Sequence, residues 1–108
     1  MTRLPPALAA SATPRILELL GDPPGRVLEL GFAGIHAVPL RLAGFDVVVV
    51  EPDPAFQERA RQRAGEVLDA VPDGPFDAVV APDSVPVPEA PVVIRVGQDG
   101  STWRLTST

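Results

Sequence analysis

One stretch of the chain, residues 26–53, limits the possible folds more than any other. It holds two apolar runs, residues 27–30, broken only by Glu29, and residues 47–50, which are separated by a glycine turn and a segment with helical spacing. Strands that are apolar on both faces are typical of the middle of a parallel sheet. Because parallel neighbours need a crossover connection, this stretch predicts a strand–helix–strand unit.

The segment between the two runs carries Ile35, Val38 and Leu42 at helical spacing, and Gly44 closes it. Pro39 conflicts with a helix that begins at Ile35, because proline removes a backbone hydrogen bond and crowds the preceding turn. Either the helix begins later, near Val38, or its first turn is distorted.

The rest of the chain predicts further elements of one α/β domain over residues 1–108. Residues 1–6 are expected to be a loose end. Helices are predicted at residues 14–20 and from residue 54, and strands at residues 76–81, 92–96 and 102–106. Residues 67–71 either continue the second of these helices or form a short strand. Residues 82–91 contain four prolines and predict an extended loop.

Composition excludes several function classes. The net charge is −5 and all nine basic residues are arginine, which disfavours a nucleic-acid partner and rules out a lysine-based phosphate loop. Without cysteine there is no disulfide framework or thiolate metal site, and no other metal cluster is evident. No signal peptide and no apolar run of about 20 residues is found, so we expect no membrane association and a cytoplasmic location.

The turn after the first strand has the character of a ligand site. Gly31-Phe32-Ala33-Gly34 stands before a helix, whose free N–H groups and positive dipole end favour an anion. Glu51 ends the second strand, 20 positions after Gly31, where a carboxylate can accept hydrogen bonds from both ribose hydroxyls. NAD, FAD and S-adenosylmethionine all fit this geometry.

The local sequence resembles class I S-adenosylmethionine-dependent methyltransferases. The resemblance rests on residues 27–31, 42–47 and 50–54, and extends more loosely over residues 14–96. It implies a minimised Rossmann-like α/β fold, with a mostly parallel sheet and helices mainly on one face.

The same resemblance implies the binding residues. Glu29 would hold the amino group of the cofactor, or else be a strand residue paired with an arginine, and Glu51 would hold the ribose. Asp69 is the nearest acid for the adenine. The predicted cofactor-binding residues are Glu29, Gly31, Phe32, Ala33, Gly34, Glu51, Pro52, Asp69 and Pro82.

The glycine turn departs from the family pattern Gly-x-Gly-x-Gly. Ala33 takes the place of the second glycine and Ile35 that of the third. Alanine costs little there if its φ stays negative, whereas isoleucine can obstruct the methionine tail of the ligand.

The segments that normally form helices beside the later strands are too short here. One sheet face is therefore expected to lack helices, although residues 79–80 and 92–94 are apolar on both sides. We expect a homodimer or a partner protein to cover this bare sheet face.

Other polar and aromatic residues have ordinary interpretations. His36 beside the turn is more typical of a surface residue than of a catalytic base, so no catalytic residue is predicted. Asp83 and Ser84 fit turn chemistry better than a substrate pocket. The arginines at 59, 61 and 63 fit a solvated helix face better than a phosphate site, and Trp103 fits an interface or core position.

The leading expectation is thus an S-adenosylmethionine-binding, methyltransferase-like protein whose acceptor is unknown. Whether it is an enzyme stays open. The alternative is a non-catalytic Rossmann-like remnant that acts as a homodimeric or partner-docking assembly module. A nicotinamide- or flavin-binding module is disfavoured, because the turn fails the dinucleotide pattern.

Overall fold

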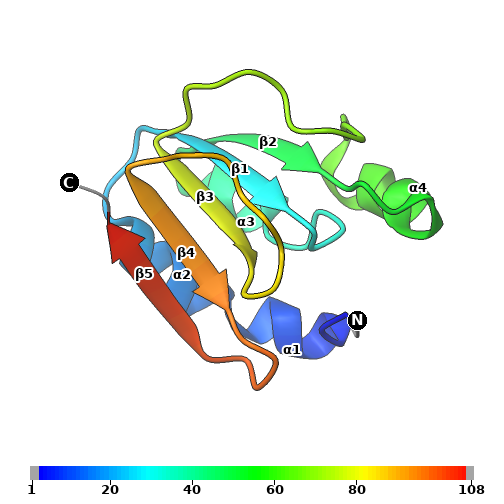
Figure 1. Cartoon of the computed structure of the whole chain (residues 1–108), viewed down its shortest axis with the longest axis horizontal. Coiled ribbons are helices and arrows are strands. Elements are labelled where there is room, and N and C mark those ends of the chain that lie inside the picture. The colour runs from blue at the N-terminus through cyan, green and yellow to red at the C-terminus, as the bar shows by residue number, and fades with distance from the viewer. Residues whose placement is uncertain (1–2, 107–108) are drawn as a thin grey trace.

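The computed structural model describes residues 3–106, and its five strands form one sheet in the order β2-β1-β3-β4-β5 (Figure 1). The strands are β1 (Arg26–Leu30), β2 (Asp46–Val50), β3 (Ala78–Pro82), β4 (Val92–Val96) and β5 (Thr102–Thr106). β1 pairs in parallel with β2 and β3, β3 pairs in parallel with β4, and β5 is antiparallel to β4. This is the expected α/β, mostly parallel, Rossmann-like sheet.

Four helices lie on one face of this sheet. They are α1 (Pro6–Ser11), α2 (Thr13–Leu20), α3 (Ala37–Leu42) and α4 (Pro54–Ala64). Each contributes at least one buried side chain to a core cluster that also contains Val27, Val47 and Ile94 of the sheet. Placement of the helices mainly on one face, as predicted, is confirmed.

Local chemistry explains where α3 and α4 begin. Asp53 caps α4 by accepting a hydrogen bond from the Ala55 N–H at 3.0 Å, and Pro54 takes the first helical position. α3 begins only at Ala37, so Pro39 falls in its first turn, where its missing N–H has no helical partner. The later start that Pro39 implied is therefore confirmed.

The N-terminal segment differs from the expected loose end. α1 begins at Pro6, because proline suits a first helical turn and Ala9 is buried beneath it. Leu4 packs against the core cluster on the helical face. Within residues 3–6 the prediction of a loose end was therefore wrong, while Met1 and Thr2 lie outside the described residues.

The face without helices is covered by irregular chain, which corrects the expectation that it is bare. Leu28 and Val79 are fully buried on this face. The residues that pack there from the irregular segments before β3 and before β4 are Leu68, Phe76, Val85, Val87 and Ala90. Segments too short or too rich in proline to form helices still supply enough apolar side chains to close the core over β1 and β3.

Residues 67–71 neither continue α4 nor form a strand, the two alternatives that the sequence left open. The helix stops at Ala64, and the chain then touches the sheet through one isolated parallel bridge between Leu68 and Val50. The chain therefore passes the outer edge of β2 before it crosses to β3.

The β4–β5 end of the same face stays less covered. Val93 is half-buried, and the residues opposite it and Arg95 in the ladder are Leu105 and Trp103. Leu105 is 54% exposed and Trp103 is 38% exposed. The bare region is thus confined to this end of the sheet.

Candidate functional site

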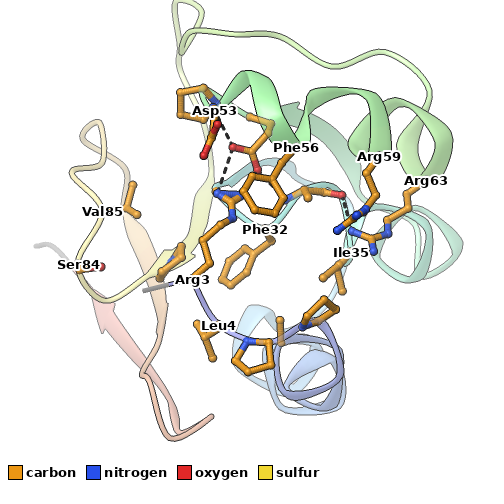
Figure 2. A pocket seen from close by; sticks show the side chains of 18 of the residues that line it. Arg3, Leu4, Phe32, Ile35, Asp53, Phe56, Arg59, Arg63, Ser84 and Val85 are labelled. Atoms are coloured by element: carbon orange, nitrogen blue, oxygen red, sulfur yellow. Dashed lines mark hydrogen bonds and ion pairs between the residues drawn. The ribbon is translucent and has the colours of Figure 1, made fainter. Parts of the chain in front are cut away.

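A pocket of about 370 Å³ opens at the carboxyl ends of β1, β2 and β3. β1 has β2 on one side and β3 on the other, so the chain reverses direction across the sheet at this point. Open α/β sheets bind ligands at such a switch point, and the volume lies within the range of small-molecule sites. Its walls include Phe32, Ile35, Phe56, Pro82 and Val85 (Figure 2).

The turn after β1 forms the floor of the pocket in a left-handed conformation. The φ angles are +86° at Gly31, +53° at Ala33 and +75° at Gly34. The condition under which alanine was expected to cost little, a negative φ at Ala33, is not met. Ile35 lines the pocket at the third-glycine position, as the sequence implied.

Glu51 follows β2 and is fully buried. Its carboxylate accepts hydrogen bonds from the Ala33 N–H at 3.0 Å and from the Asp53 N–H at 3.1 Å. These bonds tie the turn after β1 to the end of β2, and they explain how Ala33 is held at a positive φ. The carboxylate thus reaches the pocket where the sequence placed it.

Arg3 also engages this carboxylate. Both terminal nitrogens of its guanidinium donate to Glu51, and the guanidinium lies 3.9 Å from the centre of the Phe56 ring (Figure 2). Sequence reasoning missed Arg3, since nothing in the local pattern connects it with a residue 48 positions away. Arg3, in the segment before α1, therefore covers the Glu51 carboxylate at the pocket.

Glu29 lies below the turn rather than in the pocket wall. One carboxylate oxygen accepts a hydrogen bond of 2.6 Å from the His36 N–H, and Oε1 has no partner among the described residues. Burial raises the pKa of Glu29 to about 7. Among the ion pairs of residues 3–106, none joins Glu29 to an arginine.

His36 is buried in the same region and is not the surface residue that its position favoured. Its Nδ1 lies 2.8 Å from Thr13 Oγ1, and Phe32 packs edge-on against its ring. Nε2 has no partner within the described chain, and burial lowers the pKa of His36 to about 4. Glu29 and His36 form a buried polar pair that supports the turn and lies outside the pocket lining.

The structure gathers six of the nine predicted cofactor-binding residues at the pocket. They are Gly31, Phe32, Ala33, Glu51, Pro52 and Pro82. Gly34 lies behind the turn, against α4, and Asp69 is exposed outside the lining. Ser84 also lines the pocket, whereas Asp83 and Trp103 do not.

The arginines of α4 divide between two environments. Arg61 pairs with Glu58 at 3.0 Å on the outer surface, as a solvated face predicts. Arg59 and Arg63 line the pocket, and Arg63 donates to the Ala33 carbonyl at 3.1 Å (Figure 2). Arg59 is nevertheless exposed like Arg61, as a solvated face predicts, whereas Arg63 is half-buried.

These groups suit binding better than acid–base chemistry. The acidic side chains of the lining are Glu51 and Asp53, and no histidine is among the lining residues. Within residues 3–106, no cluster of three or more metal-ligating side chains occurs. The lining thus combines apolar and aromatic walls with the carboxylates of Glu51 and Asp53.

None of the helices described in residues 3–106 is long and apolar enough to cross a membrane. The sequence matches no protein-family model, and no curated protein matches it.

Proposed function

We propose that this protein binds a nucleoside of the S-adenosylmethionine type in the pocket at the carboxyl ends of β1, β2 and β3. The observation that carries the proposal is the position of Glu51, a buried carboxylate at the end of β2 that faces an aromatic pocket. A carboxylate in this place can accept hydrogen bonds from both ribose hydroxyls. Phe32 and Phe56 supply apolar surface for a base.

If the protein transfers a methyl group, its own residues act by placing the acceptor rather than by moving a proton. S-adenosylmethionine, when bound, supplies an electrophilic methyl group, and alignment of the two reactants can lower the barrier substantially. Glu51 would orient the ribose, and the apolar walls would exclude water.

Titration calorimetry with S-adenosylmethionine and S-adenosylhomocysteine, and with NAD as a comparison ligand, tests the proposal. We expect micromolar binding of the first two and its loss in Glu51→Gln, which removes the charge but keeps the length of the side chain. Asp69→Asn is the matched control, because Asp69 is exposed and outside the lining. Absence of heat with either ligand at high protein concentration would overturn the proposal.

A second proposal is a non-catalytic assembly module, and a separate observation favours it. The β4–β5 end of the sheet exposes Trp103 and Leu105 beside half-buried Val93, a surface suited to a second copy or a partner protein. Light scattering at high micromolar concentration should then show a dimer that Leu105→Lys disrupts. A monomer at that concentration would contradict the homodimer.

A further inference from the structure

Two arginines on one face of α4 reach the pocket without a carboxylate partner. Arg59 and Arg63 are one helical turn apart and both line the pocket (Figure 2). Like charges four residues apart destabilise a helix. Arg61, on the same helix, differs from these two arginines because it forms an ion pair with Glu58.

The contacts of Arg59 and Arg63 leave most of their donors available. Neither forms an ion pair among residues 3–106. Arg59 contacts the Phe56 ring, 6.0 Å from its centre, and Arg63 uses one nitrogen for the Ala33 carbonyl.

The charge balance of the pocket is opposite to that of the chain. The chain carries a net charge of −5. The charged residues that line the pocket are Arg3, Arg59 and Arg63 against Glu51 and Asp53. Glu51 is already engaged by Arg3 and by two backbone N–H groups, and Asp53 forms no ion pair with an α4 arginine among residues 3–106, so the lining carries one more positive than negative side chain.

We propose that Arg59 and Arg63 form an anion subsite that takes the terminal carboxylate or phosphate of the bound nucleoside. The proposal rests on the nucleoside-binding function inferred above and specifies its ligand class. A planar guanidinium matches carboxylate and phosphate oxygens with paired hydrogen bonds. The pocket therefore selects nucleosides with an anionic tail over neutral nucleosides.

Calorimetry with three probes tests this selection. The probes are adenosine, adenosine 5′-monophosphate and S-adenosylhomocysteine, which carry no anion, a phosphate and a carboxylate. We expect at least one anionic probe to bind about tenfold or more tighter than adenosine, as one or more hydrogen bonds between charged groups would give. The better of the two anionic probes identifies the anion.

Variants assign the effect to the two arginines. Arg59→Gln should remove most of the affinity difference between an anionic probe and adenosine, and Arg61→Gln, the matched control, should preserve that difference. Arg63→Lys keeps a charge at Arg63 and should retain part of the difference. Equal affinities for all three probes, or an equal loss in Arg59→Gln and Arg61→Gln, would overturn the subsite while the nucleoside function stands.

A titration with inorganic pyrophosphate separates failure of the subsite from failure of the nucleoside function. It is followed by the chemical shift of the Gly34 amide, because its peptide group contains the Ala33 carbonyl that accepts a hydrogen bond from Arg63. We expect a saturable shift that is absent from Arg59→Gln and present in Arg61→Gln. If adenosine does not bind but pyrophosphate does, only the nucleoside function fails, whereas no shift with pyrophosphate overturns the subsite.

Discussion

At the scale of single residues, the buried pair Glu29 and His36 gives the molecule two opposing proton linkages. Burial raises the pKa of Glu29 from 4.5 to about 7 and lowers the pKa of His36 from 6.5 to about 4. Folding thus favours the neutral form of both groups. The pair is uncharged in the folded protein at mildly acidic pH.

The pH dependence of stability follows from these shifts. The folded chain keeps a proton on Glu29 that the unfolded chain releases, so this group lowers the free energy of unfolding as pH rises from 4.5 to about 7. The unfolded chain protonates His36 more readily, so that group lowers the free energy of unfolding as pH falls from 6.5 to about 4. Each effect amounts to about 3 kcal/mol, and they largely cancel between these limits.

Single variants should show the separate pH dependence that each group gives to the free energy of unfolding. With Glu29→Gln the free energy of unfolding should rise with pH between about 4 and 6.5, and with His36→Gln it should fall between 4.5 and about 7. Urea unfolding at a series of pH values measures both, with wild type varying little. Parallel curves for the wild type and both variants would show that neither group is shifted.

At the scale of elements, the glycine turn packs against α4 at a point with no room for a side chain. A Cβ on Gly34 would lie 3.1 Å from Ala64 Cβ and 3.2 Å from the Ala60 carbonyl oxygen, at a φ of +75°. Gly65 at the end of α4 has a φ of +83° but nothing within 4 Å of an added Cβ.

These two glycines separate conformational strain from steric contact. Gly65→Ala should cost about 1–3 kcal/mol of unfolding free energy, because a φ of +83° with a ψ of −111° is a conformation that L residues rarely adopt. Gly34→Ala should cost about 1–3 kcal/mol more, because α4 must also move away from the turn. Chemical denaturation measures both, and equal losses would mean that the turn and α4 are not closely packed.

The N-terminal arm, residues 3–5 before α1, also shapes the site. Arg3 covers the Glu51 carboxylate, and its side chain is 32% exposed. Arg3→Gln should therefore raise nucleoside affinity by freeing Glu51. It should also lower the free energy of unfolding by about 1 kcal/mol, because it removes an ion pair that solvent partly screens.

Arg15→Gln is the control for Arg3→Gln, because it breaks only the exposed ion pair with Glu18. Calorimetry with S-adenosylhomocysteine and thermal unfolding measure the two quantities. Unchanged affinity in Arg3→Gln would show that the arm does not compete with the ligand, whereas Arg15→Gln should leave both quantities near the wild-type values.

At the scale of the whole molecule, irregular chain replaces a helical layer over one sheet face. Phe76 is 3% exposed in the cluster with Leu28 and Val79, and the guanidinium of Arg26 lies 4.7 Å from the centre of its ring. The core therefore has two sides of unequal construction, one covered by helices and the other by loops.

Truncation of Phe76 tests whether these loops complete the core. Phe76→Ala should cost about 3–5 kcal/mol of unfolding free energy, as buried aromatic residues do. Val71→Ala in the same irregular segment is the control, since Val71 is 40% exposed and its loss should stay within about 0.5 kcal/mol. A small effect of Phe76→Ala would mean that the loops are held loosely and that a second chain must cover this face.

The sequence by itself determined the sheet and most of its connections. The strands 92–96 and 102–106 occur where they were predicted, and Asp53 caps α4 as predicted, whereas the end of α4 at Ala64 was not foreseen. It also placed Glu51 at the pocket. Apolar runs, caps and turns act between near neighbours, so a linear pattern is enough to specify them.

Tertiary structure decided what surrounds that carboxylate. Arg3 on Glu51, Glu29 and His36 beneath the turn, and the positive φ of Ala33 all depend on contacts between distant segments. The loops that cover β1 and β3 do so because their scattered apolar residues meet the same sheet face. Such contacts have no periodic signature along the chain, and only the folded arrangement brings their members together.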